Sequence, residues 1–110
     1  MIRISPYLIP GAIISIDEII AEGFGTTVEK MVKRGRVREN TVARQFAMWF
    51  RYLHTDDKPN AIAIRYSRHH ATVRHAYLTI ENLKETNSEF RQKVNKILNQ
   101  LLKAGHGKNK

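Results

Sequence analysis

The feature that most constrains the fold is the stretch at residues 61–83, AIAIRYSRHHATVRHAYLTIENL, which has the pattern of two helices joined by a tight turn. Ile62 and Tyr66 are four residues apart and anchor a short first helix, and the turn is predicted at Ser67-Arg68. The second helix has an apolar stripe at helical spacing, made of Val73, Ala76, Tyr77, Ile80 and Leu83. Because neither helix can bury its apolar face alone, the pair must pack on further helices.

The polar positions of the second helix are cationic and gather in its opening turns. They are Arg68, His69, His70, Thr72, Arg74 and His75. At about 100° per residue, Arg68, Ala71 and His75 lie opposite the apolar stripe. Thr72 and Arg74 flank that outward face. A recognition helix presents such side chains to base edges and phosphates in a major groove. The pattern therefore predicts that Ala71 and His75 face bases and that the flanking residues face the backbones.

Charge is distributed unevenly along the 110 residues. The formal net charge is +9, from 19 Lys and Arg against 10 Asp and Glu, and the isoelectric point is near 10.2. Residues 30–76 hold eleven basic groups against three acidic ones, a net of +8, whereas residues 1–29 carry a net of −3 and residues 77–110 a net of +4. A positive field centred on the helix pair favours a polyanionic partner, most simply nucleic acid.

The remaining chain supplies further helices. Capping patterns predict four helix starts, at Ser15, Thr26, Asn40 and Thr86. Gly25 and Gly105 are expected to end helices in the left-handed conformation. The aromatic residues Phe46, Trp49 and Phe50 recur at helical spacing in the longest of these helices. We interpret them as core and not as a surface on which bases stack.

A basic loop, residues 33–38 (KRGRVR), connects two of the predicted helices. Its arginines are Arg34, Arg36 and Arg38. Because the negative potential of a minor groove favours arginine, the loop is predicted to lie along phosphates or in a minor groove. A solvated surface loop is the alternative. Arg44 and Gln45 follow near the start of the next helix, where phosphate contacts are geometrically easy.

Metal binding and catalysis find little support in the sequence. His70 and His75 are five residues and about 140° apart on a helix, whereas two metal ligands on one helix need a four-residue spacing. The chain has no cysteine, which excludes disulfides and thiolate ligands. No P-loop, dinucleotide fingerprint or pair of catalytic carboxylates is present. We therefore expect no enzyme, no metal and no cofactor, and no segment approaches a membrane span.

The segment at residues 68–76, RHHATVRHA, resembles the signature of the C-terminal DNA-binding domain, domain IV, of the bacterial replication initiator DnaA, roughly G-R-D-H-T-T-V-x-H-A. Residues 28–32 and the run KRGRVRENTVARQFAM resemble the short helix, basic loop and following helix start of that domain. The resemblance covers about residues 15–102, with both motifs in the same order and spacing. It implies an all-helical bundle with a Trp-repressor-like helix-turn-helix that reads duplex DNA.

The resemblance also assigns roles by position. Arg38 matches the family's minor-groove arginine, and Arg44 and Gln45 match residues that contact DNA at the next helix start. The matches in the signature itself are Arg68, His70, Thr72 and His75.

The chain departs from the family pattern at four positions. His69 stands where the signature has Asp, and Ala71 where it has Thr. Arg74 replaces an aliphatic residue, which adds charge beside the groove. The Gly-Gly turn before the signature is shortened around Ser67.

These inferences combine into one expectation for the fold and the function. The fold is all-α, a small helical bundle containing a helix-turn-helix, with a short extended N-terminal arm at residues 1–14, a DNA-binding domain at 15–104 and a flexible basic tail at 105–110. We expect a free-standing protein without the family's ATPase module, which 110 residues cannot hold. It would bind double-stranded DNA sequence-specifically as a monomer, in the cytoplasm and associated with the nucleoid.

Two alternatives remain open. The first is a protein-interaction adaptor that keeps the fold without reading DNA and takes a replication initiator or another protein as its partner. The second is an RNA-binding module, although a rigid helix suits the wide major groove of DNA better than the narrow one of RNA.

Overall fold

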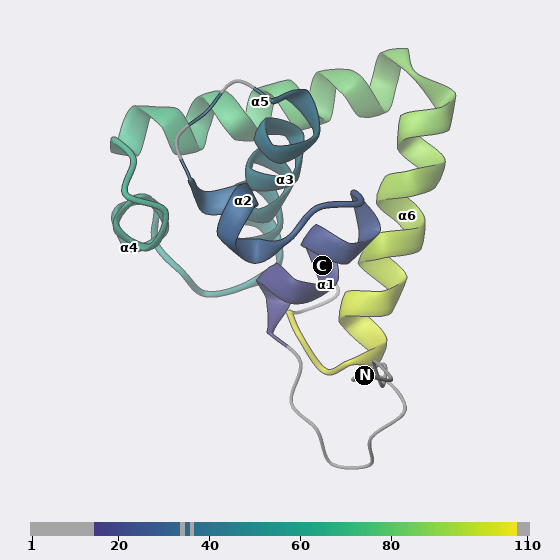
Figure 1. Cartoon of the computed structure of the whole chain (residues 1–110), viewed down its shortest axis with the longest axis horizontal. Coiled ribbons are helices and arrows are strands. Elements are labelled where there is room, and N and C mark those ends of the chain that lie inside the picture. The colour runs from purple at the N-terminus through teal and green to yellow at the C-terminus, as the bar shows by residue number, and fades with distance from the viewer. Residues whose placement is uncertain (1–14, 34, 36, 108–110) are drawn as a thin grey trace.

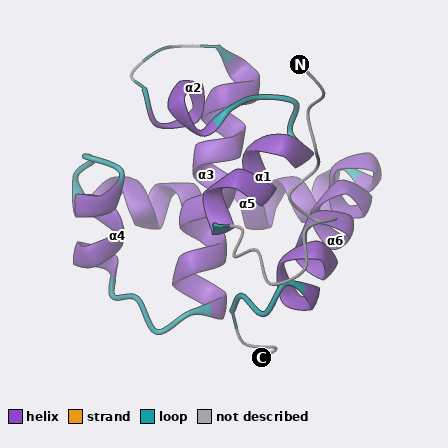
Figure 2. Cartoon of the chain, turned by 60° about the horizontal axis from the view of Figure 1, so that its bottom comes forward, coloured by secondary structure: helices purple, strands orange, loops and turns teal. Residues whose placement is uncertain are grey.

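The computed structural model describes residues 15–33, 35 and 37–107 of the chain. Within these residues the chain folds into helices alone, so the all-α prediction is confirmed (Figures 1 and 2). The helices are α1 (Ile16–Gly23), α2 (Val28–Val32), α3 (Arg38–His54), α4 (Pro59–Arg65), α5 (His70–Thr86) and α6 (Ser88–Lys103). The predicted N-terminal arm at residues 1–14 lies outside the described residues. No helix in the described part is both long and apolar enough to cross a membrane.

The core forms around α3, which packs against α1, α2, α4 and α5. Phe46, Trp49 and Phe50 of α3 are at most 1% exposed, which confirms that the aromatic cluster is core. The Phe46 ring meets the edge of Phe24, at the end of α1, with 5.4 Å between ring centroids. Fully burying aromatic side chains of this size stabilises a fold by about 1.5–3 kcal/mol each. The helix pair α4 and α5 therefore packs on this core through its contacts with α3.

The first half of the chain confirms one predicted helix start and corrects two. Ser15 caps α1, since its hydroxyl accepts from the backbone N–H three residues on at 3.1 Å. The cap of α2 is Thr27 and not Thr26, because the Thr26 hydroxyl instead donates to the side-chain oxygen of Asn40. Asn40 is thereby occupied and does not cap α3, which begins two residues earlier behind Val37. The hydrogen bond between Thr26 and Asn40 thus engages both side chains that the local sequence pattern predicted to be helix caps.

The second half shows the same one-residue error. Asn87 caps α6, and Thr86, the predicted cap, belongs to the last turn of α5. Gly25 and Gly105 do follow their helices in the left-handed conformation, with φ of 73° and 86°. α2 is the shortest of the described helices and ends at Val32.

Two glycines mark close approaches, one between α1 and α6 and one between α3 and the residues after α6. A Cβ on Gly23 would lie 2.7 Å from the Ile97 side chain, so α1 and α6 touch at this glycine. A Cβ on Gly107 would lie 2.6 Å from Cζ of Phe50. Gly107, in the predicted tail, therefore lies against α3, while residues 108–110 lie outside the described part.

Candidate nucleic-acid interface

α5 presents a stripe of exposed residues on the side away from the core. Its exposed members are spaced three and four residues apart and are Ala71, Arg74, His75 and Leu78. Val73, Ala76 and Ile80 face the opposite way and are at most 1% exposed. The structure thus turns Ala71 and His75 to solvent, as the helical spacing predicted. Thr72, on the flank, is half-buried.

The N-terminus of α5 carries histidines and no acid. His69 is the N-cap, and its Nδ1 accepts from the backbone N–H of Ala71 at 3.2 Å. The ring of His70 lies against that of His69, with 4.3 Å between centroids. The first turn of α5 contains no acidic residue, so no side chain within it neutralises the positive end of the helix dipole. Such a helix end favours an anion.

The turn between α4 and α5 includes Ser67 and Arg68, as predicted, and this corrects the other prediction, which placed Arg68 in the opening turns of α5. This residue lies in the turn and not in the opening turns of α5. Ser67 has a φ of 53°, and the Arg68 backbone N–H donates to the Ala63 carbonyl at 2.8 Å. This is the Schellman arrangement, in which glycine usually takes the left-handed position. The Arg68 guanidinium also donates to the Tyr66 carbonyl at 2.7 Å, so part of its bonding capacity stabilises the turn.

Arg44, near the start of α3, joins the basic loop to the helix pair. Its guanidinium donates to the carbonyls of Met31 at 3.0 Å and Lys33 at 3.4 Å, which ties the end of α2 to α3. Burial lowers the pKa of Arg44, and the positive charge of Arg68 lowers it further. The two guanidinium groups therefore lie close enough to repel each other. Gln45, the residue after Arg44, is half-buried.

The two described ends of the basic loop lie toward different ends of α5, Lys33 bonded to Arg44 at one end and Arg38 beside Leu83 at the other. Arg38 is exposed and lines a groove of about 170 Å³ with Leu83 and Phe90, near the C-terminus of α5. The structure therefore brings Arg44 together with the start of α5 and places Arg38 at the other end. Arg34 and Arg36 lie outside the described residues.

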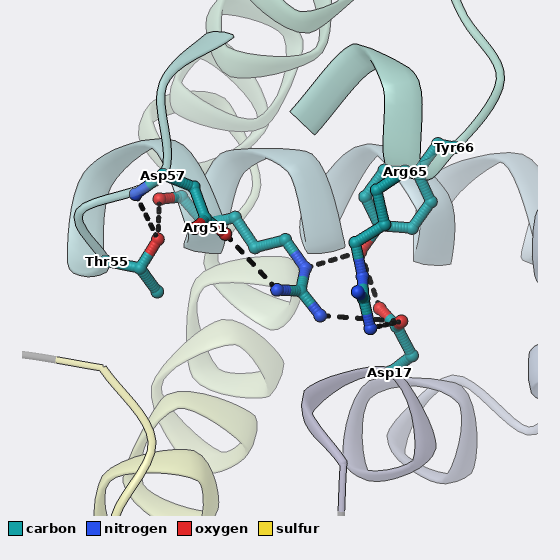
Figure 3. A network of polar contacts seen from close by, with 6 residues as sticks. All are labelled: Asp17, Arg51, Thr55, Asp57, Arg65 and Tyr66. Carbon is teal, nitrogen blue, oxygen red and sulfur yellow. Dashed lines mark hydrogen bonds and ion pairs between the residues drawn. The ribbon is translucent and has the colours of Figure 1, made fainter. Parts of the chain in front are cut away.

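Sequence reasoning missed a buried polar network behind this surface (Figure 3). Asp17 of α1 and Arg51 of α3 are 6% and 7% exposed, and an Nη of Arg51 lies 3.5 Å from the Asp17 carboxylate. The Tyr66 hydroxyl donates to Asp17 at 2.5 Å and accepts from Nε of Arg51 at 2.9 Å. Arg65 binds Asp17 at 3.2 Å and Asp57 binds Arg51 at 3.3 Å. The network joins α1, α3 and the end of α4.

Burial and neighbouring charges shift the pKa of two members of the network, Tyr66 and Arg51. Burial is the main cause that raises the pKa of Tyr66, and the Asp17 carboxylate raises it further, so the phenol stays a donor. Burial alone would lower the pKa of Arg51, but Tyr66 and Asp17 outweigh it and the pKa is raised. A weak sequence signal was available, because Arg51 falls on the buried face of α3, four residues after Ala47.

The histidines of α5 do not assemble a metal site. Among the described residues, no group of three or more side chains of the metal-binding types converges.

Comparison with known proteins gives a consistent result. The family described as bacterial dnaA protein helix-turn-helix matches residues 13–80, which extend from before α1 into α5. The chain is 37% identical over 86 residues to the chromosomal replication initiator protein DnaA of Wolbachia sp. subsp. Brugia malayi, a match that covers 77% of this chain and 19% of that protein.

Two further relatives carry the same name. The protein of Wolbachia pipientis wMel is 34% identical over 88 residues, covering 76% of this chain and 19% of its own length. That of Oleidesulfovibrio alaskensis is 35% identical over 92 residues, covering 78% and 20%. The chain thus spans about one fifth of the length of these relatives.

Proposed function

Because this chain belongs to the family of bacterial DnaA helix-turn-helix domains, we propose that it binds double-stranded DNA in a sequence-specific manner. The observation that supports the proposal most directly is the outer side of α5. Its exposed stripe combines Arg74 and His75 with the small Ala71, and its first turn holds no acid. A helix of this kind suits the floor of a major groove, where its N-terminus meets phosphates.

In the proposed complex, the outward residues of α5 read bases. His75 donates to or accepts from a base edge, and Ala71 contacts a thymine methyl group. Thr72, on the flank of the stripe, and Arg74, within it, contact phosphates, and Arg74 reaches a guanine where one lies beside it. His69 and His70 lie at the start of α5, beside the DNA backbone. Because phosphate contacts set the register, the two kinds of contact act together.

The basic loop serves the neighbouring groove in this proposal. Arg38, with Arg34 and Arg36, lies along phosphates or in the minor groove, where the negative potential favours arginine. Arg44 and Arg68 lie close together and add positive charge beside the start of α5. Gln45 contacts the backbone next to them. Part of the bonding of both arginines is internal, so we assign them to phosphates and not to bases.

The relatives are named chromosomal replication initiator proteins, and on that ground we propose that the binding serves the initiation of chromosomal replication. We propose that the protein acts as a monomer, in the cytoplasm and associated with the nucleoid. It would mark a DNA site or compete with a full-length replication initiator for one. Neither an ATPase activity nor any other catalysis is part of the proposal.

Salt dependence of DNA affinity tests the proposal. Neutralising five to eight phosphates should give log affinity for a duplex a slope of about −4.5 to −7 against log salt, because bound cations are released. Fluorescence anisotropy with a labelled duplex measures this slope. Single-stranded DNA and duplex RNA of the same sequence are the controls and should bind more weakly. Weak binding that is insensitive to salt would contradict the proposal, and stronger binding to the RNA would favour an RNA-binding module.

A protein-interaction adaptor is the second candidate function. Two large apolar side chains favour it, Ile64 on α4 at 78% exposed and Leu78 on α5 at 51% exposed. An adaptor would retain its partner after nuclease treatment, and Ile64→Ser or Leu78→Ser would weaken that interaction. The DNA-binding proposal instead expects little change in duplex affinity for Ile64→Ser.

A further inference from the structure

A buried acidic side chain on α1 is joined to the last residues of α4 (Figure 3). One carboxylate oxygen of Asp17 accepts from the Tyr66 hydroxyl at 2.5 Å. The other accepts from an Nη of Arg65 at 3.2 Å. Arg65 is the final residue of α4 and Tyr66 is its C-cap, so both contacts fall at the end of that helix.

A third helix meets the same point. Arg51 of α3 donates from Nε to the Tyr66 hydroxyl at 2.9 Å, and one of its Nη atoms lies 3.5 Å from the Asp17 carboxylate. The phenol oxygen therefore donates to α1 and accepts from α3 at once. Hydrogen bonds are directional in a way that apolar contacts are not, so this arrangement fixes where the C-cap of α4 lies.

The C-cap of α4 directly precedes the turn into α5. Ser67 follows in the left-handed conformation, and the Arg68 guanidinium donates to the Tyr66 carbonyl at 2.7 Å. The backbone between Tyr66 and the N-cap His69 is thus short and internally bonded. A shift of Tyr66 would therefore change the direction in which α5 leaves the turn.

We propose that Asp17 and Tyr66 are positioning residues for the helix-turn-helix and set the orientation in which α5 meets DNA. The role rests on the proposed DNA binding. Both residues are buried, at 6% and 1% exposed, so they act through the orientation of α5 and not by contact with DNA. Burial of a carboxylate with two guanidinium groups is weak support for stability as such, because desolvation offsets the attraction between the charges. Fixing a geometry is the better-supported use of such a group.

Asp57 provides a matched control within the same network. Its carboxylate binds Arg51 at 3.3 Å, but its side chain is 43% exposed and it lies in the connection before α4. Asp57→Asn therefore makes the same chemical change as Asp17→Asn without touching the Tyr66 hydroxyl. Tyr66→Phe is the mildest test, because it removes that hydroxyl alone and keeps the buried ring.

The experiment compares affinity for a duplex selected by the full chain with affinity for a random duplex. It is carried out at a temperature where circular dichroism shows each variant to be folded. Tyr66→Phe and Asp17→Asn should lower the ratio of the two affinities by about tenfold, and Asp57→Asn by less than about twofold. A merely structural role would leave the ratio of the folded protein unchanged. An unchanged ratio in Tyr66→Phe would overturn the proposal, even where Asp17→Asn fails to fold.

Backbone amide NMR spectra of the free protein give a second readout. In Tyr66→Phe the shifts of residues 67–75 should change while those of α6 stay as in the wild type. If the wild type distinguishes no duplex, the proposed function fails, and the amide shifts alone then decide the positioning role. Unchanged shifts at residues 67–75 would count against it.

Discussion

Helices α5 and α6 are almost equal in length, at 17 and 16 residues, and each buries three residues in the core, yet their first turns are opposite in character. α6 begins with Asn87 as cap and Glu89 in its first turn. α5 begins with His69 as cap, followed by His70, and has no acid there. An acid at a helix N-terminus stabilises the helix by about 0.3–1 kcal/mol. α5 therefore lacks the stabilisation that Glu89 gives to α6.

The difference separates the helix-turn-helix pair from the helices that support it. α1, α2 and α3 resemble α6 in carrying an acidic residue in the first turn, whereas α4 and α5, the helix-turn-helix pair, carry none. The supporting helices neutralise their own dipoles. α5, the proposed recognition helix, has no acid at its positive end, and the proposed complex supplies DNA phosphate there as the anion.

The largest expected effect is a loss of stability caused by a substitution in α6, the supporting helix of the comparison. Ile97→Ala in α6 removes a buried side chain that packs against Gly23 and should lower the free energy of unfolding by about 2–5 kcal/mol. Urea denaturation measures the loss. The folded fraction should bind duplex DNA as the wild type does, and a loss of affinity there would show that α6 also takes part in binding.

The next largest effect is a loss of DNA affinity caused by a substitution in α5. His75→Ala in α5 should cost about 1–3 kcal/mol of binding on the preferred duplex and much less on random DNA. Because His75 is exposed, the free energy of unfolding should change by no more than about 0.5 kcal/mol. Titration of both duplexes measures the difference. Equal losses on the two would mean that His75 does not read sequence.

A third prediction adds an acid to the first turn of α5 and removes the acid from the first turn of α6. His70→Glu gives α5 the acid that it lacks and should weaken duplex binding by about 1–2 kcal/mol, because the new carboxylate repels phosphate. The same change should stabilise the free protein by about 0.3–1 kcal/mol. Glu89→Gln in α6 is the control and should lower stability slightly without changing DNA affinity. Equal changes in binding for both variants would remove the distinction between the helices.

The smallest expected effect lies in the connections that precede the two helices. Ser67 holds a φ of 53° before α5, so Ser67→Gly should relieve strain and raise the free energy of unfolding by roughly 0.5–1 kcal/mol. The connection before α6 has no such strain, since Asn87 has a φ of −135°. Asn87→Gly should therefore lower stability by a few tenths of a kcal/mol. Thermal denaturation of both variants checks the opposite signs.

Features that depend on local periodicity were predictable from the sequence. The helical order of the chain, the aromatic core of α3 and the buried stripe of α5 all follow from the spacing of apolar residues, which the fold preserves. The outward direction of Ala71 and His75 followed from the same spacing. The DnaA resemblance of residues 68–76 predicted the family that the comparisons then showed.

Features that depend on contacts between distant residues were not predictable. Thr26 and Thr86 each precede another strong capping residue, and the local pattern could not decide between neighbours. The bond between Thr26 and Asn40, 14 residues apart, settled the first case in the fold. Asp17 and Tyr66 are 49 residues apart, so their hydrogen bond leaves no periodic signal in the sequence.

The double role of Arg44 and Arg68 was hidden for the same reason. Their guanidinium groups bond to backbone carbonyls that only the folded chain brings within reach. Charge and position alone made them look like free phosphate ligands. The contacts of these arginines with DNA, like those of His69, His70 and Arg38, remain predictions.

Selection from random duplex DNA, carried out in parallel with the wild type and His75→Ala, tests the central claim that the outward stripe of α5 reads sequence. The wild type should enrich one short duplex motif. The variant should enrich a motif that is relaxed at one or two adjacent base pairs and unchanged elsewhere. Failure of the wild type to enrich any motif, or an identical motif from both proteins, would contradict the claim.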